Sequence, residues 1–157
     1  SKTWAMTGWR LGWGLWPEPL IEGAERLQIN ANSCANAAAQ VAAVEAIRGP
    51  QDQVEEMVNA FEKRAIYIAG ALDGLPGVSC QQPRGAFYVF PNISGTGLTS
   101  AEMQNALLDE ADVAVVGGTS FGDLGEGHIR ISCAASLEDL EEAVMRIGMF
   151  LERKASS

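Results

Sequence analysis

Apolar and polar positions follow a helical period over two long stretches of the chain. In the first, apolar side chains recur at spacings of three and four, which places them on one face of a helix that ends near Gly74. These side chains are Val54, Val58, Phe61, Ala65, Ile68 and Leu72. A second row of apolar positions with helical spacing predicts the last helix, with Ser136 as its N-terminal cap. Its apolar positions are Leu137, Leu140, Val144, Ile147 and Leu151.

Propensity and capping signals predict the remaining helices. The segment Cys34–Arg48 is rich in alanine and stops at a Gly-Pro pair, which favours a helix on both counts. A shorter helix is predicted over Pro19–Leu27, because proline is accepted in a first helical turn. The hydroxyl of Thr99 and the carboxylate of Glu102 have the spacing of a capping box, which opens a helix through Ala111.

Short apolar, aromatic or β-branched runs between turn residues predict strands. These runs are Trp9–Trp16 (a short strand or an extended segment), Val78–Cys80, Ala86–Phe90, Val113–Val116 and His128–Cys133. The order of elements predicts an α/β fold, with helices covering a mainly antiparallel sheet. At 157 residues, the chain is long enough for one domain and part of another.

Composition narrows the functional classes. Eleven Lys and Arg against 20 Asp and Glu leave a net charge of −9, which argues against a nucleic-acid partner or an anionic membrane, because both require a cationic surface. The most apolar stretch, Ala31–Ile47, is interrupted by polar side chains, so no membrane span is predicted. Three separated cysteines and one histidine form no ligand motif, which predicts neither a disulfide framework nor a zinc site and favours a reducing cytoplasm.

An ordered set of motifs is more specific than any of these features. Ser1–Gly12 has the sequence SKTWAMTGWRLG, with a small residue before a lysine and then Gly-x-Arg-apolar-Gly. This run resembles the lysine signature of class I/II, fold-type-I pyridoxal-phosphate aminotransferases. The resemblance continues along the whole chain, through Gly49–Gln51, Gly85–Phe90, Gly118–Gly122 and His128–Ser132.

The resemblance implies roles for four side chains. Lys2 matches the lysine that holds pyridoxal 5′-phosphate through a Schiff base and then moves a proton on the substrate. Arg10 and Ser1 match positions that bind the cofactor phosphate, and Arg130 matches the arginine that clamps the substrate carboxylate. An arginine between two isoleucines in a strand also suggests a paired role on its own, although strand alternation permits an exposed charge at an edge.

Other side chains that bear chemistry are assigned to packing. His128 has no serine or aspartate arrangement around it, and it lies in a predicted strand. Phe87 and Tyr88 form an aromatic pair in another predicted strand, where core packing is more common than contact with a substrate. Generic phosphate-loop, zinc-protease and serine-hydrolase motifs do not occur in the sequence.

The same resemblance implies an organisation for the chain. Residues 1–48 match the C-terminal remnant of a large cofactor-binding domain, with its last strand and helices. Residues 49–157 match a small C-terminal domain that begins with a long connecting helix. Because the chain starts one residue before Lys2, most of the large domain is expected to lie outside it, and the isolated chain is expected to transaminate poorly.

The parent activity implied by the resemblance is transfer of an amino group between an amino acid and a 2-oxo acid, by a cytoplasmic homodimer. Two alternatives stay open. A pyridoxal-phosphate-dependent C–S lyase, or another member that does not transaminate, shares the lysine and both arginines. The aminotransferase-like sensor domain of a transcription regulator would require a basic DNA-binding segment upstream. The sequence does not indicate which amino donor and acceptor would be used.

Overall fold

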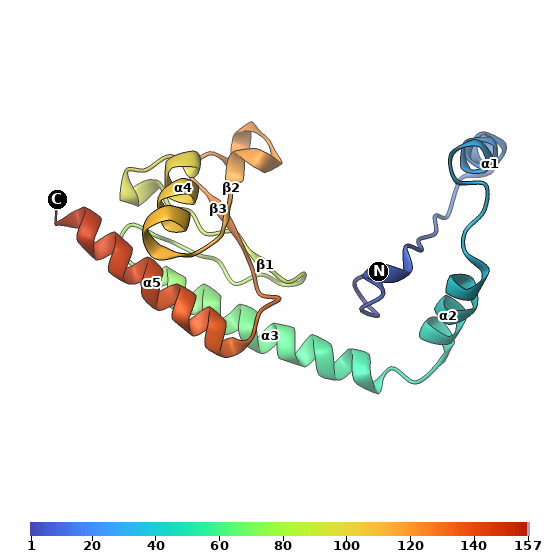
Figure 1. The fold of residues 1–157 in the computed structure, drawn as a ribbon, viewed down its shortest axis with the longest axis horizontal. Coiled ribbons are helices and arrows are strands. Elements are labelled where there is room, and N and C mark those ends of the chain that lie inside the picture. The colour runs from blue at the N-terminus through green and yellow to red at the C-terminus, as the bar shows by residue number, and fades with distance from the viewer. Residues whose placement is uncertain (157) are drawn as a thin grey trace. The chain divides into compact units, whose positions relative to one another are not determined.

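The chain divides into two compact units in a computed structural model that describes residues 1–156 (Figure 1). The first unit comprises Ser1–Met57, and the second begins at Val58. Within residues 1–156, no helix combines the length and the apolar character that crossing a bilayer would require.

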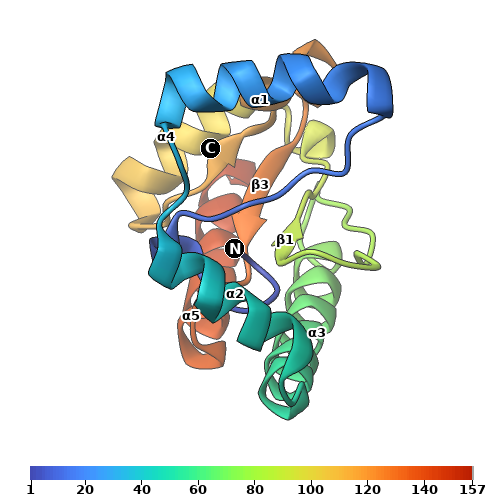
Figure 2. The same cartoon turned by 90° about the vertical axis from the view of Figure 1, so that its right-hand side faces the viewer.

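The first unit is helical apart from its N-terminal run. A 3-10 turn, η1 (Thr7–Trp9), is followed by irregular backbone that leads into α1 (Glu18–Asn32) and then α2 (Ala37–Arg48), as Figure 2 shows. The long helix α3 (Asp52–Asp73) begins in this unit and continues into the second. For Trp9–Trp16, the sequence predicts a short strand or an extended run. After η1 this segment forms no strand, because no neighbouring segment within residues 1–156 pairs with it through backbone hydrogen bonds.

Local capping decides where these helices begin and end. The side chain of Asn36 accepts a hydrogen bond from the backbone N–H of Ala39, so α2 begins at Ala37 rather than at the predicted Cys34. The predicted helix over Pro19–Leu27 is confirmed and runs further, to Asn32, since no breaking residue intervenes.

The second unit contains an antiparallel sheet with helices packed against it. After α3 its elements are β1 (Tyr88–Val89), η2 (Ser94–Thr96), α4 (Ser100–Ala111), β2 (Val116–Gly117), η3 (Gly118–Phe121), η4 (Asp123–Gly125), β3 (Ile129–Ser132) and α5 (Leu137–Ala155). The strand order is β1-β3-β2, and both pairings are antiparallel. In both views, the later turns of α3 and the first turns of α5 lie below the strands and α4 (Figures 1 and 2). The predicted fold class is confirmed.

The strands are shorter than predicted. Val78–Cys80 contributes only an isolated bridge between Ser79 and Asn92, and β2 begins at Val116, the last residue of its predicted run. Pairing depends on which residues lie opposite one another, and local composition does not specify that. The helix α4 begins at Ser100 and is capped by Thr99, with both hydrogen bonds of the predicted capping box present.

The strand register gives the sheet two different faces. Tyr88 lies opposite Ser132, and Val89 lies opposite Ile131. Val89, Ile129 and Ile131 are buried, whereas Tyr88 is only partly covered. Because side chains alternate between the faces of a strand, Arg130 falls on the face opposite to the core.

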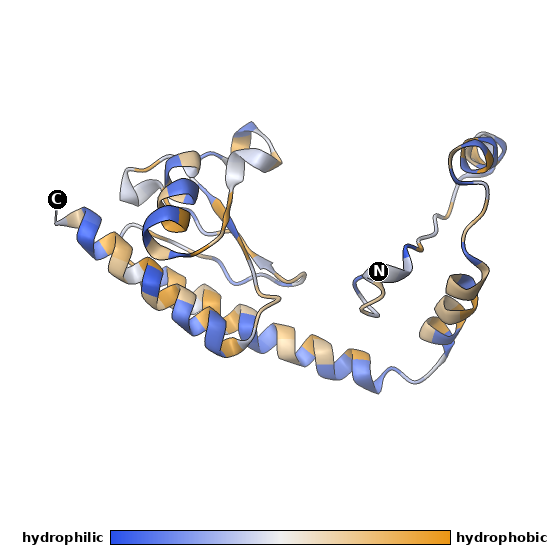
Figure 3. Cartoon of the chain, in the orientation of Figure 1, coloured by the Kyte–Doolittle hydropathy of each residue, from blue (hydrophilic) through white to orange (hydrophobic). Residues whose placement is uncertain are grey.

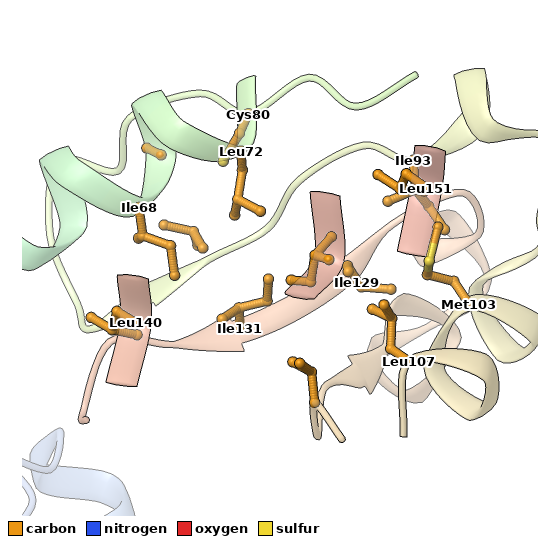
Figure 4. Close-up of a cluster of buried hydrophobic side chains, with 14 of the residues drawn as sticks. Ile68, Leu72, Cys80, Ile93, Met103, Leu107, Ile129, Ile131, Leu140 and Leu151 are labelled. Carbon is orange, nitrogen blue, oxygen red and sulfur yellow. The ribbon is translucent and has the colours of Figure 1, made fainter. Parts of the chain in front are cut away.

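The core of the second unit joins the buried face of the sheet to three helices (Figure 4). The labelled members come from α3, α4, α5, β3 and two connecting segments, and they are Ile68, Leu72, Cys80, Ile93, Met103, Leu107, Ile129, Ile131, Leu140 and Leu151. The predicted seam of α3 enters this core only in its later turns, since Val58 is 54% exposed. The fully buried Phe150 of α5 was not among the predicted apolar positions.

Candidate active site

The N-terminal loop is closed by one hydrogen bond between its two ends and by two more within its first six residues. The hydroxyl of Ser1 donates to the carbonyl oxygen of Leu11 at 3.4 Å. The backbone N–H of Met6 donates to the Ser1 carbonyl at 2.8 Å, and that of Ala5 donates to the Lys2 carbonyl at 3.1 Å. Residues at the start and the end of this segment are therefore held in one loop.

Lys2 and Arg10 both present their side chains from this loop. Arg10 ends η1 in the left-handed conformation, with φ of 52°, and its Nη1 donates to the carbonyl oxygen of Thr7 at 3.2 Å. Both side chains are exposed. In the described chain, the Lys2 ammonium takes part in no hydrogen bond or ion pair.

Trp4 connects the loop to the segment before α3. Its indole Nε1 donates to Oε1 of Gln51 at 3.1 Å, and its ring lies 6.0 Å from that of Trp13. Gln51 in turn donates from Nε2 to the carbonyl oxygens of Ala46 and Gly49. The C-terminal end of α2 therefore supports the loop that carries Lys2.

The donor set of this loop fits pyridoxal 5′-phosphate. A primary amine can condense with an aldehyde, while a guanidinium and a hydroxyl are suitable donors to a phosphate dianion. Ser1, Lys2 and Arg10 supply these three groups within one hydrogen-bonded loop.

Large apolar side chains are exposed elsewhere in the first unit. Leu15 is 97% exposed, and α1 contains no buried residue. Figure 3 shows the same apolar character along α2, where Val41 and Ile47 are exposed. Apolar surface of this extent is typical of an interaction face.

Arg130 is the centre of an aromatic cluster in the second unit. Its guanidinium carbon lies 4.3 Å from the ring centroid of Tyr88 and 4.3 Å from that of Phe121. Phe90 contacts Phe121 edge-on, with a centroid separation of 6.2 Å. Arg130 is partly buried. Such packing restricts the guanidinium while leaving its in-plane N–H groups available to an anion.

His128 is engaged within the chain. Its Nδ1 lies 3.1 Å from the carbonyl oxygen of Glu126, and its Nε2 lies 3.3 Å from the side-chain nitrogen of Asn92. The ring is stacked on that of Phe90 at 5.1 Å. Since a carbonyl only accepts, Nδ1 carries a proton and Nε2 accepts from the amide. Both ring nitrogens therefore have partners.

Neither the cysteines nor any group of possible metal ligands in residues 1–156 forms a second candidate site. Cys34 is exposed, whereas Cys80 and Cys133 are buried, and all three are free thiols. Burial raises the pKa of the Cys80 thiol to about 11, with a further contribution from Asp73. Burial also raises the pKa of Cys133. Across residues 1–156, no cluster of His, Cys, Asp or Glu is arranged to hold a metal ion.

Of the predicted site residues, the structure gathers Ser1, Lys2 and Arg10 in one loop, while Arg130 belongs to the second unit. The assignment of Tyr88 to the core is wrong, because its ring lies against Arg130 and outside the buried cluster. Strand alternation would have revealed this if the register had been known. Phe87 packs against Phe61 at 5.6 Å and is also only partly buried.

Comparison with known proteins supplies the family. The family model described as aminotransferase class I and II matches residues 1–147. The chain is 45% identical over 156 residues to an aspartate aminotransferase of Pyrococcus horikoshii, covering 97% of this chain and 39% of that protein. It is 44% identical over 158 residues to aromatic-amino-acid aminotransferase 2 of Thermococcus litoralis, covering 98% of this chain and 40% of that protein.

Solved structures agree with these matches. The crystal structure of an aromatic aminotransferase from P. horikoshii OT3 superimposes with a TM-score of 0.95 and 40% identity, covering all of this chain and 42% of that one. An aspartate aminotransferase from Rhizobium meliloti gives a TM-score of 0.91 at 36% identity, with 97% of this chain and 40% of that one covered. The chain thus spans about two fifths of the length of these relatives, and it belongs to the class I and II aminotransferase family.

Proposed function

We propose that this chain provides the lysine and the two arginines of a pyridoxal-phosphate-dependent aminotransferase, which moves an amino group between an amino acid and a 2-oxo acid. The observation that carries the proposal is the closed loop from Ser1 to Leu11, which holds an exposed amine and an exposed guanidinium. Family membership supports it, because enzymes of this family are built around that cofactor.

In this proposal each group of the loop has a distinct task. The cofactor, when bound, supplies an aldehyde and an electron-withdrawing ring. The Nζ of Lys2 would hold the cofactor through its aldehyde, and the same amine would hold and return a proton at the substrate α-carbon. The Arg10 guanidinium and the Ser1 hydroxyl would bind the phosphate. Because a hydroxyl donates only one proton, the Ser1 hydroxyl would exchange its hydrogen bond to the Leu11 carbonyl for one to the phosphate.

Arg130 has the second task, which is to bind the substrate carboxylate. A carboxylate presents two coplanar oxygens, and a guanidinium edge donates to both in parallel. The two rings packed on Arg130 leave that edge as its polar surface. The substrate side chain is left unspecified by these contacts.

The organisation predicted from the resemblance forms part of the proposal. Residues 1–48 would complete a large cofactor-binding domain, and residues 49–157 would form the small domain. The exposed apolar side chains of α1 and α2 support assembly into a homodimer with the rest of the large domain present. The free thiols, including the exposed Cys34, suit the cytoplasm.

The relatives favour transamination over the two alternatives. Those named above are all called aminotransferases, and their names mention neither a C–S lyase nor a transcription regulator. A lyase would require no 2-oxo acid as a co-substrate, so the requirement for an amino acceptor distinguishes the two reactions.

A chimera tests the proposal, with this chain replacing the matched part of the P. horikoshii aspartate aminotransferase. We expect amino transfer that depends on both the cofactor and a 2-oxo acid. Lys2→Ala should lower it by more than about a hundredfold, the usual contribution of a general acid–base group. Lys63→Ala, at an exposed lysine of α3, is the matched control. Full activity in Lys2→Ala would refute the proposal.

The isolated chain is the complementary test. With added cofactor and substrates, we expect no useful turnover, because the chain spans 39% of the length of that relative. Turnover at a rate comparable to the chimera would contradict this expectation.

A further inference from the structure

We propose that Tyr88 and Phe121 are positioning residues that clamp Arg130 between their rings and so fix the direction in which it binds a carboxylate. The inference rests on the proposed function, in which Arg130 binds the substrate. It goes further by assigning roles to two aromatic residues that would act through Arg130 rather than by contacting the substrate.

The two rings reach Arg130 from elements on the two flanks of its strand. Arg130 lies on β3, the central strand of the order β1-β3-β2. Tyr88 comes from β1, diagonally across from Arg130, and long side chains at diagonal positions are within reach of one another. Phe121 ends η3, which directly follows β2 on the other flank. Both ring centroids are 4.3 Å from the guanidinium carbon.

Each ring is itself supported by further aromatic contacts. Phe87 lies 4.4 Å from the Tyr88 ring and continues the contact to Phe61 of α3. On the other side, Phe90 meets Phe121 at an interplanar angle of 79°. The clamp is therefore part of a connected set of rings, which limits how far either ring can move.

The guanidinium has no polar partner inside the described chain. Arg26 and Arg146 form ion pairs with glutamates one helical turn away. For the Arg130 guanidinium, the contacts found within residues 1–156 are those with the two rings. A partly buried cation without an acceptor is costly unless a ligand provides one. The clamp therefore holds a ready donor edge for an external acceptor.

Preorganisation is the physical benefit of this arrangement. A free arginine side chain loses rotamer freedom when it grips a ligand, and that loss weakens binding. The contacts with two rings, each centred 4.3 Å from the guanidinium carbon, reduce this freedom before the ligand arrives. They also force the ligand to approach in the plane of the guanidinium, which suits a carboxylate.

The test uses the isotope-labelled full chain and NMR of the Arg130 Nε–Hε group, identified by its loss in Arg130→Gln. In the unsubstituted chain, the two rings should shift this resonance and the neighbouring Hδ signals upfield. Phe121→Leu and Tyr88→Leu should each move them back, whereas Phe121→Tyr and Tyr88→Phe keep a ring and should not. Leu124→Ala, at a 99% exposed residue of the adjoining turn, is the control.

Titration with 3-phenylpropionate, a carboxylate, then measures the binding role, and 2-phenylethylamine serves as the probe without a carboxylate. We expect each leucine variant to weaken carboxylate binding by about twofold to tenfold, the effect of freeing one long side chain. Binding of the amine should stay unchanged in all variants.

The outcomes separate the two proposals. If Arg130→Gln weakens carboxylate binding but the leucine variants leave the affinity and the Arg130 resonances unchanged, the clamp is refuted and the role of Arg130 stands. If Arg130→Gln has no effect on carboxylate binding, the proposed role of Arg130 fails and the clamp loses its purpose. Equal weakening of both probes by the leucine variants would also overturn the clamp, since it indicates general disruption.

Discussion

Replacing Leu107 by alanine should destabilise the second unit strongly. Leu107 lies in α4 with 0% of its side chain exposed, in the core formed with α3, α5 and the sheet. The change removes three buried carbons, worth about 0.8 kcal/mol each. Incomplete collapse of the resulting cavity adds to this, so we expect a loss of about 3 kcal/mol in the free energy of unfolding.

Leu108→Ala is a closely matched control. It makes the same chemical change in the same helix, so the effect of helix propensity cancels, but Leu108 is 53% exposed. We expect it to cost less than about 1 kcal/mol, as most surface substitutions do.

Urea denaturation followed by far-ultraviolet circular dichroism measures both variants. With a slope of about 1–3 kcal/mol per molar urea, the Leu107→Ala midpoint should fall by about 1–3 M, and that of Leu108→Ala by much less. Tryptophan fluorescence is a poor probe here, because all four tryptophans lie in the first 16 residues. Equal midpoints for the two variants would refute the assignment of Leu107 to the core.

Two further predictions follow from titrating groups. The Glu126 carboxylate accepts hydrogen bonds from the backbone N–H groups of Ser100 and Gly127, and these lower its pKa below 4.5. The charged carboxylate therefore stabilises the folded state above the pKa that Glu126 has in the unfolded chain, and this stabilisation is lost as the pH falls through the folded-state pKa. Glu126→Gln should lower the free energy of unfolding at pH 7 and leave it equal to that of the unsubstituted chain in acid. A loss of stability that does not depend on pH would contradict this prediction. At pH 8, iodoacetamide should alkylate the exposed Cys34 rapidly, and the buried Cys80 and Cys133 only after unfolding. Mass spectrometry identifies each alkylated site. Rapid alkylation of either buried thiol in the folded protein would oppose the prediction.

The helices could be predicted because their signals are local. The capping box at Thr99 and the seam through Ile68 and Leu72 involve residues within a few positions of one another. The weak strands could not be delimited in this way. Val78–Cys80 has strand composition, but its pairing with Asn92 reduces to one bridge, which depends on contacts distant in sequence.

The candidate site was predictable where its residues lie within short sequence motifs. The resemblance of two motifs to the aminotransferase family points to Lys2, Arg10 and Arg130 as candidates. The aromatic neighbours of Arg130 follow no such rule. Phe121 reaches it from a 3-10 turn after a glycine pair, a segment without strand or helix periodicity. Tyr88 required the strand register, which the sequence alone does not provide.

That register connects the stability of the fold to the orientation of the site. β3 places Ile129 and Ile131 in the core, and the same alternation directs Arg130 to the other face. A slip of one residue would expose both isoleucines, at about 1.5–3 kcal/mol each, and would drive an unpaired guanidinium into the core at a cost of several more. The sum approaches the whole stability of an ordinary domain, about 5–15 kcal/mol. The packing that folds the second unit therefore also fixes the side of the sheet on which Arg130 lies, and so the side from which the proposed carboxylate would approach.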